Sequence, residues 1–144
     1  LDEPTTGLDP QARRNFWDLV KRIRADGTTV ILTTHYMEEA QILCDEIAIM
    51  DAGNIMIQGA PDELLKQHYK KSIIELPLDD FHGDLADLEY RVVKALGIIE
   101  IATNDVNESL RVLTEYSIGL NRMKIRQPNL EDLFLDLTGH SLRN

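Results

Sequence analysis

The chain has 144 residues, enough for one ordinary domain or two small ones, and its 43% hydrophobic and 28% charged residues are typical of a folded protein. Its net charge of −10 disfavours nucleic acid as a partner, because binding phosphates requires clustered Lys and Arg. No apolar run approaches the roughly 20 residues that span a bilayer. No signal peptide is recognisable, because the chain opens with Leu1, Asp2 and Glu3. We expect residue 1 to be a cut point.

The first half predicts an α/β layer with a parallel sheet. Asp9 and Pro10 predict a helix start, as N-cap and first helical residue, and Asp26-Gly27 predicts its end. The β-branched, non-alternating run 28–34 predicts a strand that is buried on both faces. The elements expected after it are a helix over 36–43, a hairpin of strands 46–50 and 54–58, and a helix over 61–69.

The pair Lys70-Lys71 predicts a domain boundary, which gives domains 1–71 and 72–144. The second domain reads as strand, helix, strand, helix, strand, helix over 72–78, 84–97, 98–103, 106–117, 120–126 and 129–138. This order predicts a small α+β domain, for which a ferredoxin-like fold is one candidate. The apolar face of the last helix either packs on this small sheet or contacts a second subunit or a membrane partner.

Three side chains are candidates for chemistry. Asp2 and Glu3 follow Leu1, the end of a predicted strand, and His35 follows the strand 28–34. Ligands of open α/β sheets bind beyond the carboxyl ends of the strands, so these groups could converge there. One carboxylate could hold Mg²⁺, the other could orient or deprotonate a water, and the histidine could donate to a phosphate oxygen.

The ordered motifs of residues 1–67 resemble those of ABC ATPases. LDEPTTGLDP at 1–10 resembles the Walker B end and D-loop, with Thr6 in place of the usual serine, and TTHYMEEA at 33–40 resembles the switch-histidine segment. CDEIAIMDAG at 44–53 and GAPDEL at 59–64 resemble the segments that follow. The tail QPNLEDLFLDLTG at 127–139 resembles exporter ATPases of the daunorubicin-resistance type.

The resemblance implies a role for each matching residue. Asp2 would help to hold Mg²⁺, Glu3 would be the catalytic base, Asp9 would contact the partner subunit, and His35 would sense the γ-phosphate of ATP. It also implies a partial P-loop NTPase sheet. The partners implied are an ABC permease membrane subunit and a second ATPase subunit, in a homo- or heterodimer on the cytoplasmic face of the plasma membrane. The single cysteine, Cys44, fits a reducing cytosol.

The chain contains no Gly-x-x-x-x-Gly-Lys-Ser/Thr loop and no Leu-Ser-Gly-Gly-Gln-like signature, and a Q-loop is also absent. We therefore expect the 144-residue chain to lack ATPase activity and to bind ATP and Mg²⁺ weakly.

Other interpretations remain open at this point. Asp2 and Glu3 could be solvated terminal acids, and Asp9 could serve only as an N-cap. The acids Asp79, Asp80, Asp84, Asp87 and Glu89 are interpreted as a solvated helix start rather than a metal site. Residues 72–144 could be a regulatory or dimerisation module, and the parent could be a soluble ABC ATPase that does not work in transport.

Overall fold

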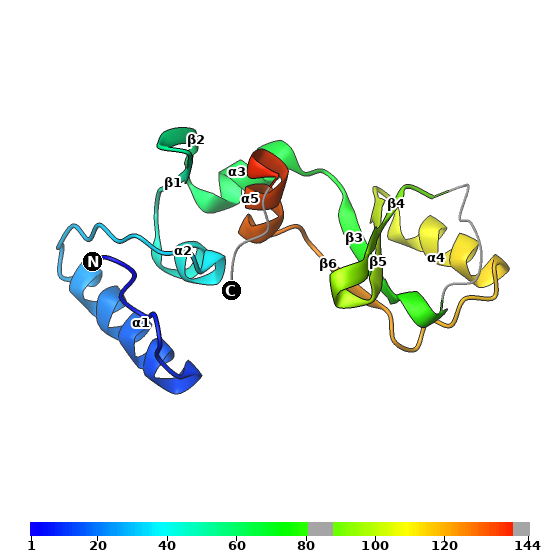
Figure 1. The fold of residues 1–144 in the computed structure, drawn as a ribbon, viewed down its shortest axis with the longest axis horizontal. Coiled ribbons are helices and arrows are strands. Elements are labelled where there is room, and N and C mark those ends of the chain that lie inside the picture. Colours follow the sequence, from blue (N-terminus) through cyan, green and yellow to red (C-terminus); the bar gives the residue numbers. More distant parts are fainter. Residues whose placement is uncertain (81–87, 140–144) are drawn as a thin grey trace. The chain divides into compact units, whose positions relative to one another are not determined.

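A computed structural model describes residues 1–80 and 88–139, which divide into two compact units (Figure 1). The described residues of Leu1–Lys66 and Leu130–Gly139 form the first unit, and those of Gln67–Asn129 form the second. The division into domains 1–71 and 72–144 stays a prediction. No helix among the described residues is both long enough and apolar enough to cross a membrane.

The first unit is mainly helical. Its elements are α1 (Pro10–Ala25), α2 (Met37–Leu43), the hairpin of β1 (Ile47–Asp51) and β2 (Asn54–Gly59), α3 (Pro61–His68) and α5 (Leu130–Thr138). Helix α1 packs on α2 through the buried side chains of Trp17, Val20 and Leu43. The antiparallel hairpin and the three predicted helices are confirmed, with bounds shifted by one or two residues.

The prediction of a buried strand over 28–34 is wrong. The segment forms only an isolated parallel bridge, between Asp2 and Thr33, and Ile31 is 79% exposed. A strand requires a hydrogen-bonded neighbour, and within residues 1–80 and 88–139 the backbone of 29–34 bonds only to the backbone of Leu1 and Glu3. The described residues therefore show a mixed α/β chain whose sheets are antiparallel, and the expected parallel sheet is not present in them.

The second unit is a four-stranded antiparallel sheet covered on one face by a helix. The strands are β3 (Ser72–Pro77), β4 (Tyr90–Val93), β5 (Ile98–Thr103) and β6 (Lys124–Arg126), in the order β4-β5-β3-β6. Helix α4 (Val106–Glu115) lies against the sheet (Figure 1), and 3₁₀ turns occupy Leu78–Asp80 and Lys94–Leu96. A ferredoxin-like fold is compatible with this order, but it stays a prediction because residues 81–87 lie outside the described residues.

The core of the second unit follows the alternation of its strands. Ile74 and Leu76 of β3 pair with Ile101 and Ile99 of β5, and all four are buried against Leu113 of α4. Burial of one face of each central strand explains why these positions are large and aliphatic, and it fixes the register of the sheet.

Two expectations for the second half are wrong. Where a helix was expected over 84–97, the described part contains β4 and a 3₁₀ turn, because the β-branched pair Val92-Val93 pairs with β5. The residues 84–87 of that expectation lie outside the described ones. Helix α5 was expected either on the small sheet or against a second subunit or membrane partner, and it packs on α2 in the first unit, where Leu130 and Leu133 are fully buried.

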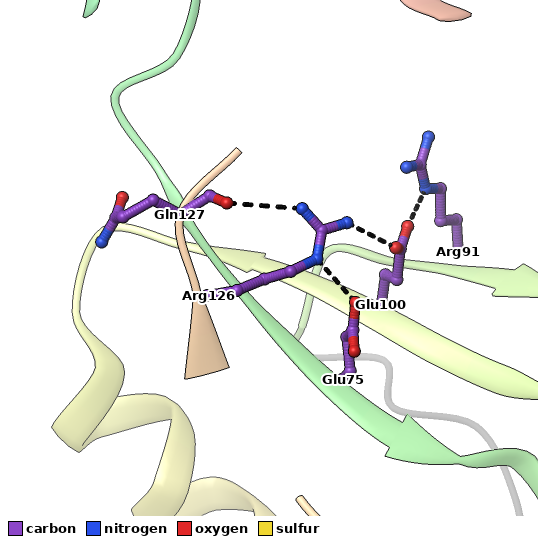
Figure 2. Close-up of polar contacts among 5 residues, drawn as sticks. All are labelled: Glu75, Arg91, Glu100, Arg126 and Gln127. Atoms are coloured by element: carbon purple, nitrogen blue, oxygen red, sulfur yellow. Dashed lines mark hydrogen bonds and ion pairs between the residues drawn. The ribbon is translucent and has the colours of Figure 1, made fainter. Parts of the chain in front are cut away.

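The other face of the sheet carries a network of alternating charges (Figure 2). Glu75 and Glu100 lie directly opposite each other on β3 and β5. Arg126 bridges them, with Nε 2.6 Å from Glu75 and Nη2 2.9 Å from Glu100, and Arg91 also pairs with Glu100. The two arginines thus neutralise two carboxylates that would otherwise repel each other across the strands.

Candidate functional site

The N-terminal segment is held beside the segment 28–34 by a short parallel ladder. The Thr33 amide donates to the Leu1 carbonyl at 2.8 Å, and the Glu3 amide donates to the Thr33 carbonyl at 2.9 Å. The Thr33 hydroxyl donates to the Asp2 carboxylate. This pairing brings residues that are 30 positions apart in the sequence to one place, as the sequence predicted for Asp2, Glu3 and His35.

Glu3 and His35 form the centre of the candidate site. Nδ1 of His35 lies 3.1 Å from Oε1 of Glu3, and the two side chains are 36% and 50% exposed. A neutral imidazole can donate this hydrogen bond from Nδ1, and a protonated one makes it an ion pair. The φ angle of Glu3 is 41°, in the left-handed region that residues with a side chain rarely adopt. Such strain is common at functional sites, where the surrounding structure holds the residue in place.

Asp9 has different hydrogen-bond partners from Glu3 and His35. Its Oδ1 accepts from the amides of Gln11 and Ala12, each at 2.9 Å, so it is the N-cap of α1. The N-cap role expected from the sequence is therefore confirmed, and the predicted contact with a partner subunit stays a prediction. Asp9 and Glu3 are joined by the turn 3–8, in which the Thr6 amide donates to the Glu3 carbonyl at 3.2 Å.

Several groups around the pair did not follow from the sequence. The Thr33 hydroxyl contacts Asp2, the Thr6 hydroxyl lies 3.4 Å from Glu3 Oε2, and the Thr34 hydroxyl accepts from the Tyr36 amide at 3.0 Å. The ring of Tyr36 lies 4.2 Å from the ring of His35. The position of Thr33 and Thr34 directly before His35 was the available signal, because short hydroxyl side chains commonly hydrogen-bond nearby backbone and carboxylates.

The site fits part of a Mg²⁺–nucleotide complex. Asp2 is exposed and could hold Mg²⁺ through water, while Glu3 and His35 face each other beside it. Among residues 1–80 and 88–139, no three His, Cys, Asp or Glu side chains are grouped closely enough to hold a metal ion. The residues therefore supply one carboxylate ligand and two groups that can act on water or phosphate, but not a complete metal or phosphate site.

Cys44, which follows α2, is not suited to nucleophilic chemistry. Burial, and then the charges of Glu39 and Asp45, raise the pKa of its thiol, against a smaller opposing effect of Arg24. Thiolate formation is therefore disfavoured at neutral pH. Cys44 is a free, partly buried cysteine.

Comparison with known proteins extends the similarity along the whole chain. The Nod factor export ATP-binding protein I of Bradyrhizobium diazoefficiens is 38% identical over 147 residues, which cover 99% of this chain and 47% of that protein. The protein of the same name from Ralstonia nicotianae is 40% identical over 151 residues, covering 100% of the chain and 47% of the relative. The one from Cupriavidus pinatubonensis is 37% identical, covering 100% and 45%.

These matches support the interpretation of the chain as part of an ABC transporter ATP-binding protein. The chain spans about half the length of the curated relatives that it matches. No protein-family model matches the chain. The relatives carry export in their names, but these names do not support the daunorubicin-resistance subfamily that the tail at 127–139 suggested.

Proposed function

We propose that the chain is the C-terminal part of the ATP-hydrolysing subunit of an ABC exporter. The observation that carries the proposal is the contact between Glu3 and His35, 3.1 Å apart although they are 32 positions apart in the sequence. Similarity along the whole of this chain to part of two proteins named Nod factor export ATP-binding protein I supports the same function. The daunorubicin-resistance type stays a prediction that rests on residues 127–139 alone.

In this proposal each residue has a role that its geometry permits. Asp2 would help to hold Mg²⁺, which when bound would supply positive charge against the nucleotide phosphates. Glu3 orients or deprotonates the attacking water, and His35 donates a hydrogen bond to the γ-phosphate. The contact between Glu3 and His35 keeps both groups at one place before nucleotide binds. Asp9, at the start of α1, contacts a second ATPase subunit.

The phosphate-binding loop and the signature motif are proposed to lie in the half of the relatives that this chain does not match. The 144-residue chain by itself is then inactive. The complete subunit pairs with a second ATPase subunit and a permease on the cytoplasmic face of the plasma membrane, and nucleic acid is not a partner. The word export in the relatives' names favours transport over a soluble ABC ATPase outside transport.

The test is ATP hydrolysis by the natural protein that contains this chain, purified with and without the substitution Glu3→Gln. Loss of a general base lowers turnover by about 10²–10⁴-fold, so we expect a decrease of at least a hundredfold with ATP binding retained. Glu63→Gln, on the exposed side of α3, is the matched control and should leave the rate unchanged. Equal rates for the wild-type and Glu3→Gln proteins, or turnover by the 144-residue chain alone, would refute the proposal.

A second candidate function concerns the second unit. Its own core of Ile74, Leu76, Ile99, Ile101 and Leu113 favours a separately folded regulatory or dimerisation module. Size-exclusion chromatography of the full chain and of a chain without residues 67–129 tests it. A dimer that requires these residues is expected, and a monomer in both cases would exclude a dimerisation role for the chain by itself.

A further inference from the structure

Three contacts of α1 side chains link helix α1 to α2 and its N-cap residue. The contacts occur at three successive levels, which join Arg13 with Tyr36, Trp17 with Glu39, and Arg24 with Leu43. Both members of each pair advance along the chain together, so the two helices run in the same direction. Helix α1 begins directly after Asp9, and α2 begins two residues after His35. The contacts thus join the segments that present two of the proposed functional residues.

The contact between Trp17 and Glu39 is the unusual one of the three. The Trp17 indole Nε1 donates to Glu39 Oε1 at 3.0 Å, and the Glu39 side chain has no exposed surface. Within the described part of the chain, Glu39 Oε2 has no hydrogen-bond partner. Burial of a carboxylate with a single neutral donor is costly, and an apolar residue of similar size would cost less. Stability alone therefore does not explain a glutamate at this position.

The need for a directional contact explains the glutamate at position 39 better than stability does. An apolar pair would hold α2 against α1 but would allow α2 to rotate about its own axis or to slide. A hydrogen bond from a buried indole to a buried carboxylate oxygen is satisfied only over a narrow range of positions and angles. The bond between Trp17 and Glu39 therefore fixes the rotation of α2 relative to α1.

The rotation of α2 is transmitted to His35 through Tyr36. Tyr36 is the N-cap of α2, and its ring lies 4.2 Å from the His35 ring and 4.4 Å from the guanidinium carbon of Arg13. A turn of α2 would carry Tyr36 away from Arg13 and would displace the neighbouring imidazole. Because His35 lies only 3.1 Å from Glu3, a small displacement would break that contact.

We propose that Glu39 and Trp17 are positioning residues that hold His35 against Glu3 by fixing the rotation of α2. Neither touches the reacting groups. The importance of this for ATP hydrolysis rests on the proposed function, whereas the positioning of His35 can be tested without nucleotide. A failure of the ATPase test and a failure of the positioning test are therefore distinguishable.

The test is NMR of the full chain at a fixed neutral pH. The His35 imidazole resonances are assigned by their disappearance in His35→Asn, and Glu3→Gln defines the displacement that follows loss of the partner carboxylate. We expect Glu39→Leu to move the His35 resonances at least half as far as Glu3→Gln does. Glu39→Gln keeps an oxygen that can accept from Trp17, and it should move them less than a quarter as far.

Two further variants keep the test decisive. Trp17→Phe retains an aromatic ring without the N–H donor, so it should displace the His35 resonances as Glu39→Leu does. It tests the same hydrogen bond even if Glu39→Leu does not fold. Leu64→Ala removes a buried side chain of α3 and serves as the control for a general loss of packing. It should lower the stability of the chain and leave the His35 resonances in place.

The only tryptophan of the chain adds a second readout, because its fluorescence reports Trp17 alone. Its emission should change in Glu39→Leu and be largely restored in Glu39→Gln. The proposal is overturned if Glu39→Leu and Trp17→Phe leave the His35 resonances at their wild-type positions. It is also overturned if Leu64→Ala moves them equally, or if Glu3→Gln does not move them at all.

Discussion

Replacing Arg126 by methionine removes the centre of the charge network on the second unit. Its guanidinium lies 2.6 Å from Glu75 and 2.9 Å from Glu100, whose side chains are 19% and 7% exposed. Methionine keeps much of the apolar stem but none of the charge. The two carboxylates are then left facing each other on adjacent strands, with only Arg91 still paired with Glu100.

The expected loss of stability in Arg126→Met follows from the burial of the two carboxylates. Removing one partner of a buried ion pair costs about 3–5 kcal/mol, because the remaining charge loses its compensation. The Arg126 side chain is 26% exposed, so water screens part of this loss, and we expect about 2–3 kcal/mol. For a unit of this size, that corresponds to a decrease in Tm of roughly 10 °C or more.

Hydrogen exchange of the β3 and β5 amides in the full chain measures the loss of stability of the second unit specifically. Arg111→Met on α4 is the matched control, because Arg111 pairs with Glu108 and Glu115 on the surface and should matter little. Equal protection of these amides in both variants would show that the network does not stabilise the sheet.

Three other predictions concern the first unit. Asp9→Ala removes the N-cap of α1 and should cost about 1 kcal/mol in urea unfolding, whereas Asp9→Asn should cost less; equal losses would contradict the capping argument. Because burial raises the pKa of Cys44, its thiol should react with a disulfide reagent at about pH 8 more slowly than in unfolded chain, and Asp45→Asn should speed the reaction. Leu133→Ala should lower the free energy of unfolding followed by Trp17 fluorescence by about 2–5 kcal/mol, and no change would argue against the burial of α5.

The elements that the sequence predicted well are those with local signals. The N-cap Asp9 and Pro10 define the start of α1, and the residues 51–54 define the turn between β1 and β2. In each case the side chains that determine the conformation lie within a few positions of it. The strands β3 and β5 were found for the same reason, since their aliphatic residues are contiguous in the sequence.

The errors concern elements whose conformation depends on distant partners. The run 28–34 has the composition of a buried strand, but its pairing depends on neighbours that composition does not specify. The β4 segment follows a stretch that resembles a helix start, and only its pairing with β5 makes it a strand. The apolar face of α5 was recognised, but periodicity does not tell which surface such a face covers.

The candidate site was predicted in part. The convergence of Glu3 and His35 followed from placing both at strand ends, and this contact is present although the long strand is not. The contribution of Tyr36 and of the bond between Trp17 and Glu39 could not be predicted, because it depends on how two helices pack. Helix packing depends on side-chain shape along both surfaces, which periodicity alone does not determine.

The strand pairing of the second unit determines how easily this unit could be exchanged or deleted. The unit is entered through β3 and left through β6, and these two strands are antiparallel neighbours, with Ile73 opposite Arg126. The polypeptide therefore enters and leaves this unit at almost the same point. An insertion with adjoining ends can be exchanged or deleted with a short splice, while the interrupted host domain keeps its own path.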